Sequence, residues 1–234
     1  MYPVVCFDVG FTLLDERTDA HTLLSAVLIE RGHDVDATAL RAAQQATGRW
    51  YHQRYHTLDN GDWSSDAAIR ALWLQFYEHL FTTLDPTLDH AMLADTLISH
   101  YETPANWQIF PDVLPTLAAL RERGVRIGVV SDWSSALRPI LHHSGLSRYL
   151  DFVVGSADSG YAKPLSDLYR LAVDRAQVPA HQIIHIGDSY YADVLGARAV
   201  GMEAALIDRH HRAPRTDCRV LHDLREILAV VDDE

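Results

Sequence analysis

Residues 3–12 read Pro-Val-Val-Cys-Phe-Asp-Val-Gly-Phe-Thr, an apolar run that ends at an aspartate. A nearly all-apolar run of this length is typical of a central strand in a parallel sheet, because such a strand is buried on both faces. In open α/β sheets, ligands bind outside the carboxyl ends of the strands. Asp8 therefore stands where the chemistry of such a fold is expected, if the rest of the chain supplies the sheet.

The stretch that follows shows only helical periodicity. Apolar residues recur every three or four positions in segments 23–31, 37–57, 69–80 and 86–101. This spacing predicts amphipathic helices and no strand. We interpret the stripe of Trp73, Phe76 and Leu80 as helical core. A wall facing the substrate or a dimer surface stays an alternative for some of the aromatic residues of this stretch. His52 and His56 are interpreted as a solvent-exposed pair, since no third metal ligand accompanies them.

From about residue 111 the pattern changes to an alternation of strands and helices. The predicted strands are 125–130, 151–155, 182–186 and 203–207, and the predicted helices are 112–123, 134–144, 164–177, 190–200 and 221–231. Alternation at this spacing produces right-handed βαβ units and a parallel sheet. The sequence thus predicts an α/β fold. Residues 1–15 and 104–234 would form a Rossmann-like parallel-sheet core, and residues 16–103 an inserted α-helical cap domain.

The composition excludes several classes of partner. The 234 residues include 20 Lys and Arg against 32 Asp and Glu, so the formal net charge is −12. We expect neither a nucleic-acid partner nor a membrane partner, because both require basic patches. The N-terminus lacks the charged and apolar segments of a signal peptide, and no apolar run is long enough to span a membrane. We therefore expect a cytoplasmic monomer or homodimer.

Residues that could take part in chemistry follow four of the predicted strands. They are Asp8, Gly10 and Thr12 after the first strand, Ser131 and Asp132 after the second, Lys163-Pro164 after the third, and Gly187-Asp188 with Asp193 after the fourth. Each is weak evidence alone, because an aspartate at a strand end is often a turn former. Together, and with Lys163 as the only lysine in the sequence, they indicate one site. We expect Asp132 to cap the helix that follows it.

This arrangement resembles the haloacid dehalogenase-like (HAD) hydrolase superfamily, in its helical-cap (C1) subfamily I type. Asp8 to Thr12 is similar to the first motif of that superfamily, Ser131 to the second, Lys163-Pro164 to the third and Gly187-Asp188 with Asp193 to the fourth. The similarity extends over essentially the whole chain. It implies a phosphatase that acts on a small phosphorylated metabolite, with Asp8 as the nucleophile that forms an aspartyl-phosphate.

The resemblance also implies a Mg²⁺ cofactor. Its protein ligands would be Asp8, the backbone carbonyl of Gly10 and Asp188, with Asp193 supporting them or binding occasionally. Mg²⁺ favours a few hard oxygen ligands completed by water and phosphate. Lys163 would stand as a point cation between Asp8 and the phosphate. Thr12 and Ser131 would donate hydroxyl hydrogen bonds to the phosphoryl oxygens.

Position 10 departs from the phosphatase motif of the superfamily, which has a second aspartate there. That aspartate protonates the leaving alcohol, and Gly10 has no side chain that could do so. General acid–base help is typically about 10²–10⁴-fold. The departure implies a slow phosphatase, a good leaving group or an acid borrowed from elsewhere. Asp15, Glu16 and His21 are candidates for that acid, although each is more consistent with a hinge or surface position.

Two other functions stay open. A catalytically silent protein that binds phosphate or a metabolite would keep the metal site, and the glycine at position 10 is the feature that favours it. The third hypothesis for the function is a haloacid dehalogenase. Gly187-Asp188 argues against the dehalogenase, because it keeps a metal-binding carboxylate that dehalogenation does not need.

Overall fold

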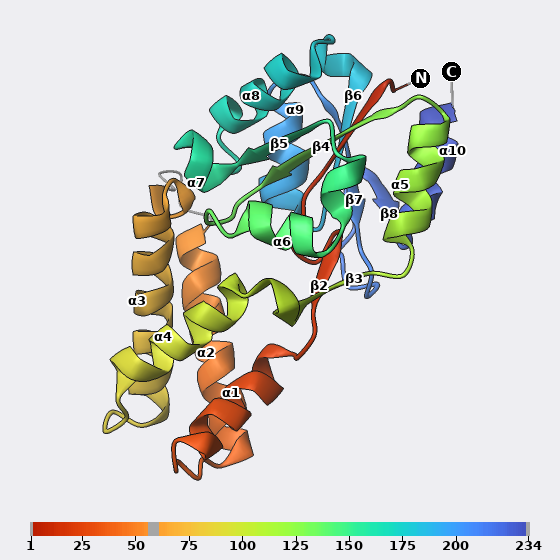
Figure 1. The fold of residues 1–234 in the computed structure, drawn as a ribbon. Coiled ribbons are helices and arrows are strands. Elements are labelled where there is room, and N and C mark those ends of the chain that lie inside the picture. The colour runs from red at the N-terminus through yellow and green to blue at the C-terminus, as the bar shows by residue number, and fades with distance from the viewer. Residues whose placement is uncertain (1, 56–60, 233–234) are drawn as a thin grey trace.

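Figure 1 shows a computed structural model of the chain, which describes residues 2–55 and 61–232. Six strands form one sheet in the order β5-β4-β1-β6-β7-β8, and every pairing is parallel. The strands are β1 (Val4–Phe7), β4 (Arg126–Ser131), β5 (Phe152–Gly155), β6 (Ile183–Gly187), β7 (Glu203–Ile207) and β8 (Arg219–Leu221). The predicted α/β fold with a parallel sheet is confirmed, and the apolar run at the N-terminus is its central strand.

Alternate side chains of the strands enter two separate cores, because successive residues of a strand point to opposite faces. Val5 and Phe7 pack with α5 (Val113–Glu122), α6 (Leu137–His143) and α10 (Ile227–Asp232). Val4 and Cys6 pack on the other face, against α8 (Ser166–Ala176), the π-helical turn η5 (Tyr190–Leu195) and α9 (Gly196–Arg198). All four of these β1 residues are fully buried. Both faces of the sheet are therefore covered by helices, as the apolar run predicts.

The helices α1–α4 stand apart from the sheet, at the lower left of Figure 1. They are α1 (Ala20–Glu30), α2 (Ala37–Tyr55), α3 (Asp66–Leu84) and α4 (His90–Glu102). Their apolar faces form a third cluster that includes Leu28, Leu40, Phe81 and Leu93. Ser65 caps α3 by accepting a hydrogen bond from the Ala68 N–H, which is why the helix starts there. The end of the predicted helix 37–57 and His56 lie outside the described residues.

A short antiparallel ribbon joins the two parts. Strand β2 (Leu14–Glu16) pairs with β3 (Trp107–Ile109), with Leu14 opposite Ile109 and Glu16 opposite Trp107. The prediction of helices alone from residue 16 onward is therefore wrong at Glu16, which ends a strand. Strands of three residues are too short to show a periodicity in the sequence. The predicted boundaries of the cap at residues 16 and 103 stay a prediction.

Other differences from the sequence prediction lie at the ends of elements. Strand β8 falls where no strand is predicted, and the helix predicted at 221–231 begins only after it, with η6 at Leu224. The helix predicted at 134–144 begins at Leu137, and the one predicted at 190–200 opens with the π-helical turn. The remaining short helices are α7 (Ser156–Ser159), η1 (Gly61–Trp63), η2 (Pro104–Asn106), η3 (Leu146–Tyr149), η4 (Ala180–Gln182) and η6 (Leu224–Glu226). No helix within residues 2–55 and 61–232 is long and apolar enough to cross a membrane.

The third cluster gives a direct test of how the helical part is held together. Phe81 is fully buried in it, whereas Ile29 of α1 is 68% exposed. We expect Phe81→Ala to lower the free energy of unfolding by about 3–5 kcal/mol, because it removes a buried ring and leaves a cavity. Ile29→Ala is the control and should stay within about 0.5 kcal/mol of wild type. Urea denaturation measures both, and equal effects would contradict this description of the cluster.

Candidate active site

The carboxyl ends of β1, β4 and β6 meet at one edge of the sheet and bring three predicted site residues together there. Asp8 continues the ladder beyond β1, since its N–H donates to the Ile186 carbonyl at 2.9 Å. Ser131 ends β4, and its Oγ donates to Asp8 Oδ1 at 3.0 Å. Asp188 follows β6 and lines the same cavity as Asp8. The spacing of four strand ends in the sequence thus corresponds to one site in space.

Lys163 is the centre of this site. Its ammonium donates to Asp8 Oδ1 and to Asp193 Oδ1, both at 2.6 Å, and its side chain is 3% exposed. Burial by itself lowers the pKa of the Lys163 ammonium, but the two carboxylates raise that pKa above its usual value. The amine therefore stays protonated at neutral pH. It serves as a fixed positive charge and not as a nucleophile.

Asp193 holds the lysine from the other side. Its Oδ1 also accepts a hydrogen bond from His185 Nε2 at 2.9 Å, and its Oδ2 accepts from the Ser189 N–H at 3.0 Å. Burial would raise the pKa of Asp193, but the charge of Lys163 and the His185 hydrogen bond bring it below its usual value. Gly187 leaves room for this carboxylate, because a Cβ there would lie 2.1 Å from Asp193 Cγ. Because both of its carboxylate oxygens accept hydrogen bonds from these residues, Asp193 is held in place and in turn positions Lys163.

The predicted metal ligands offer oxygen atoms only. Burial is the main cause of the raised pKa of both Asp8 and Asp188. The negative charge of Asp8 raises the pKa of Asp188 further. Two carboxyl groups that resist ionisation together are stabilised by a cation. No group of three His, Cys, Asp or Glu side chains gathers as a metal cluster in the described residues. Two carboxylates and the carbonyl of Gly10, which also lines the cavity, are nevertheless a donor set that suits Mg²⁺.

Thr12 lies away from the cavity. It is fully buried, its backbone carbonyl accepts a hydrogen bond from Arg209 Nη2 at 2.7 Å, and its Oγ1 has no partner among the described residues. Its predicted contact with phosphate stays a prediction. Phe11, which sequence analysis did not single out, has a positive φ of 54° and lines the cavity with a side chain that is 46% exposed.

Asp132 does not cap a helix, so that prediction is wrong. Helix α6 starts only at Leu137, whereas Asp132 Oδ1 accepts the backbone N–H of Lys163 at 3.0 Å. Its carboxylate therefore helps to hold the loop that carries the lysine. Loss of bulk water raises the pKa of Asp132 to about 7, although the charge of Lys163 opposes this. The hydrogen-bond partner of Asp132 is thus a residue far away in the sequence, which local sequence patterns do not indicate.

A cavity of about 590 Å³ opens from this site towards helices α2, α3 and α4. Of the predicted core stripe, Leu80 is buried, whereas Trp73 and Phe76 are half-buried and pack against the third cluster. All three residues also line the cavity, so the stripe is part of the helical core and at the same time part of the cavity wall. Trp133, which follows Asp132, is the main residue that sequence analysis missed, because nothing in the local pattern relates it to Gly10. A Cβ at position 10 would lie 3.3 Å from Trp133 Cζ3.

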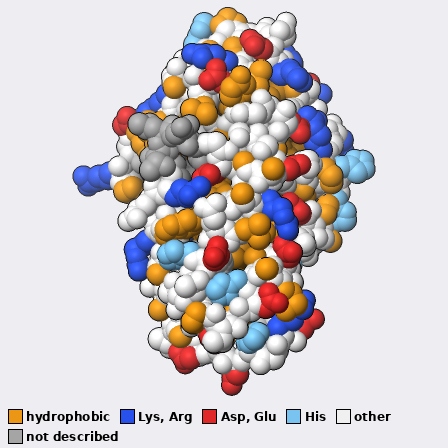
Figure 2. Space-filling view, turned by 90° about the vertical axis from the view of Figure 1, so that its left-hand side faces the viewer, with side chains coloured by type: hydrophobic (Ala, Val, Ile, Leu, Met, Phe, Trp, Pro, Cys, Tyr) orange, Lys and Arg blue, Asp and Glu red, His pale blue; other side chains and the backbone are white. Residues whose placement is uncertain are grey.

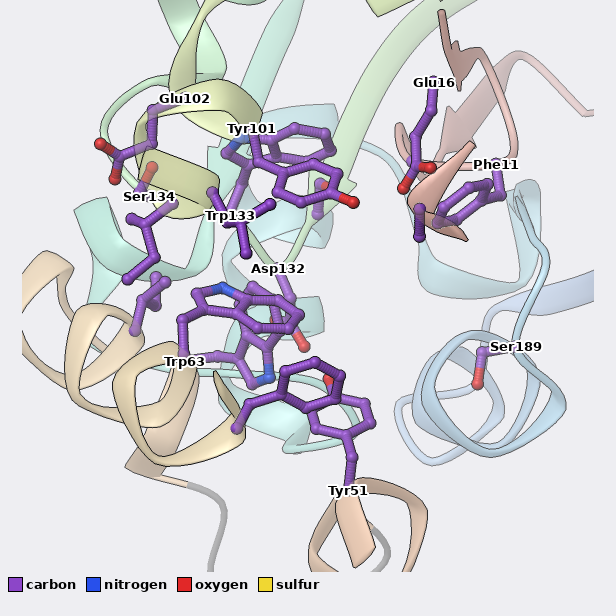
Figure 3. A pocket seen from close by; sticks show the side chains of 18 of the residues that line it. Phe11, Glu16, Tyr51, Trp63, Tyr101, Glu102, Asp132, Trp133, Ser134 and Ser189 are labelled. Atoms are coloured by element: carbon purple, nitrogen blue, oxygen red, sulfur yellow. The ribbon is translucent and has the colours of Figure 1, made fainter. Parts of the chain in front are cut away.

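Of the three candidates for a substitute acid, only Glu16 lines the cavity. Figure 3 shows its carboxyl group beside Phe11 at the border of the open space. Burial first, and then the charges of Asp15 and Asp19, raise the pKa of Glu16 to about 7. Asp15 Oδ1 instead accepts the Glu16 N–H at 3.0 Å, and His21 Nδ1 lies 2.7 Å from Gln44 Oε1.

Comparisons with known proteins point to one family. The family model for haloacid dehalogenase-like hydrolases matches residues 2–201. The haloacid dehalogenase-like hydrolase domain-containing protein 3 of Bos taurus is 31% identical over 206 residues, which cover 87% of this chain and 81% of that protein. The ribulose-1,5-bisphosphate 5-phosphatase of Halopiger xanaduensis is 33% identical over 110 residues, 47% of this chain and 46% of that protein.

A solved structure shows the same fold over the whole length. It is that of a HAD-hydrolase from Bacillus subtilis described as bound to magnesium, with a TM-score of 0.75, 18% identity and coverage of 99% of both chains. Three observations lead to one conclusion: the lysine buried between Asp8 and Asp193, the parallel sheet and the match of the family model over most of the sequence. The chain belongs to the haloacid dehalogenase-like hydrolase family.

Proposed function

We propose that this protein is a Mg²⁺-dependent phosphatase that hydrolyses a small phosphorylated metabolite through an aspartyl-phosphate on Asp8. The observation that carries the proposal is the contact of 2.6 Å between Lys163 Nζ and Asp8 Oδ1 in a buried site. A phosphate monoester dianion and a carboxylate repel each other, and a fixed cation between them lowers that repulsion strongly where bulk water is excluded. The phosphatase name of the Halopiger relative supports the same reaction.

We propose a separate task for each oxygen of Asp8. Oδ1 accepts the hydrogen bonds of Ser131 and Lys163, and Oδ2 receives none from the described residues. Oδ2 would attack phosphorus, and the bond from phosphorus to the ester oxygen would break with its electron pair leaving on that oxygen. Water would then hydrolyse the aspartyl-phosphate and regenerate the carboxylate. Ser131 and Lys163 keep the carboxylate oriented throughout.

Asp8, the Gly10 carbonyl and Asp188 would hold Mg²⁺, which when bound neutralises charge on the transferring phosphoryl group. The magnesium described for the Bacillus subtilis structure supports the choice of this metal. The net charge of −12 supports a small-molecule substrate over nucleic acid or an anionic membrane. The oligomeric state, monomer or homodimer, stays a prediction.

Removal of the nucleophile tests the reaction. We expect Asp8→Asn to lower phosphate release from the best ester of a metabolite panel by about 10³-fold or more, as loss of a nucleophile does in other enzymes. Asp174→Asn, an exposed change on α8, is the control and should keep full activity. If wild type binds inorganic phosphate but hydrolyses no ester of the panel, the silent binding protein replaces the phosphatase.

Metal binding has its own test, which does not depend on turnover. We expect Asp188→Ala to weaken Mg²⁺ binding at least about tenfold, because even groups that merely support a metal ligand contribute about 10–100-fold. Isothermal titration with MgCl₂ measures the affinity, and Asp174→Ala is the matched control. An unchanged affinity in Asp188→Ala would place the metal elsewhere.

The ionisation of Glu16 decides whether it can donate a proton at neutral pH. Its pKa is about 7 in the folded protein and about 4.3 in an unfolded chain. The folded state thus binds the proton more tightly, so the free energy of unfolding should fall as pH rises from about 4.5 to 7. Glu16→Gln should remove this contribution, and Asp15→Asn should move it to lower pH. Urea denaturation between pH 4.5 and 8 measures the difference, and parallel curves for wild type and Glu16→Gln would contradict the shift.

A further inference from the structure

We propose that the substrate is a phosphate monoester whose leaving group carries an uncharged aromatic ring, and that this ring binds in the cavity beside Asp8. The proposal rests on the phosphatase function above and adds the chemical class of its substrate. Four cap residues form what we call the aromatic wall: Tyr51, Trp63, Trp73 and Phe76. All four line the cavity and are half-buried.

The rings of the aromatic wall support one another around Trp73. The Trp73 centroid lies 5.8 Å from that of Tyr51, 5.7 Å from Trp63 and 5.4 Å from Phe76. These residues come from α2, η1 and α3, so the wall exists only when the helices are packed. Rings held by such neighbours lose little freedom when another ring stacks on them, and aromatic pairs are favourable beyond the area they bury. The wall is therefore prepared for a planar apolar ligand.

The aromatic residues face inward. Figure 3 shows Tyr51 and Trp63 on one side of the open space, with Tyr101 and Phe11 across from them. In the outer view of Figure 2, hydrophobic side chains are scattered among charged ones and form no single large patch. A wall that served only as core would be buried, whereas these rings border a space large enough for a ligand of drug-like size.

The charges in the cavity select against an anionic leaving group. Among the described residues that line it, Lys163 is the only lysine or arginine, and its ammonium is already bound to two carboxylates. Glu16 and Glu102 add carboxyl groups to the rim. A second phosphate or a carboxylate on the leaving group would meet no other cation among these described residues, and the carboxylates would repel it. The cavity would therefore discriminate against anionic leaving groups by an unfavourable contact.

The apolar surface reaches the reacting centre itself. Trp133 lies against Gly10, where a Cβ would come within 3.3 Å of its ring, and its centroid is 4.7 Å from that of Trp107. An aromatic ring attached directly to the ester oxygen would meet apolar protein atoms at once. Such an ester also suits the glycine at position 10, since a phenolic oxygen with an ordinary pKa of about 10 leaves more readily than an alkoxide.

Binding of stable phosphonates tests this inference apart from catalysis. With Mg²⁺ present, the affinities of phenylphosphonate, 1-naphthylphosphonate, methylphosphonate and 2-carboxyethylphosphonate are measured by isothermal titration. We expect the aryl compounds to bind about tenfold more tightly than methylphosphonate, or better, because they bury a ring against other rings. The carboxylate compound should bind more weakly than methylphosphonate.

Variants locate the effect. Trp73→Leu should remove most of the aryl preference and leave methylphosphonate affinity unchanged, while Trp73→Phe should keep most of it, which protects the test if the leucine variant folds poorly. The matched control is Trp50→Leu, because Trp50 lies next to Tyr51 on α2 but stacks on His79 at 5.4 Å and does not line the cavity. Melting temperatures establish that each variant is folded.

The outcomes separate this inference from the proposed function. Equal affinity for aryl and methyl compounds, or tighter binding of the carboxylate compound, would overturn the aromatic substrate even if wild type hydrolyses alkyl phosphates in an Asp8-dependent way. Preferred aryl binding together with hydrolysis of phenyl phosphate supports both. Preferred aryl binding without hydrolysis of any ester supports the aromatic subsite and overturns the phosphatase.

Discussion

The ammonium of Lys163, buried between the carboxylates of Asp8 and Asp193, is the interaction on which the rest of the site depends. A buried charge is tolerated only when it is paired, and removal of one partner typically costs about 3–5 kcal/mol. The surrounding residues serve this pairing. His185 and the Ser189 N–H hold Asp193, and Asp132 holds the backbone of Lys163. The same pairing keeps the lysine charged, as the proposed binding of phosphate requires.

The site divides its work between the two parts of the chain. The sheet edge supplies charges and hydrogen-bond donors, which under the proposed function would bind a phosphoryl group, and the helices supply an apolar space beside it. Rings connect the two: Trp133 beside Gly10 contacts Trp107 at 4.7 Å, and Trp107 Nε1 donates to the Tyr101 carbonyl at 2.9 Å. Trp107 lies on β3 of the ribbon that joins helices α1–α4 to the sheet. The shape of the cavity near Asp8 therefore depends on the position of that ribbon.

Much of the fold and of the charged site at the edge of the sheet was predictable from sequence. An apolar run buried on both faces, followed by alternating strands and helices, leaves a parallel sheet as the simplest solution, and its strand ends must share one edge. Asp8, Ser131 and Lys163 therefore meet as predicted. Strands β2, β3 and β8 were not predictable, because three residues show no period and their pairing is decided by partners distant in sequence.

Sequence by itself determined the sheet, the family and which charged residues gather at its edge, because these follow from local periodicity and from motif order. Only the tertiary structure decided that Asp132 holds the Lys163 loop, that Trp133 fills the space beside Gly10 and that Trp73 and Phe76 face a cavity. A helical stripe of apolar residues looks the same whether it packs against a neighbour or borders an open space. Whether the stripe is packed or borders a cavity depends on the distance between the helices and the sheet. That distance results from the packing of many segments and cannot be predicted from one of them.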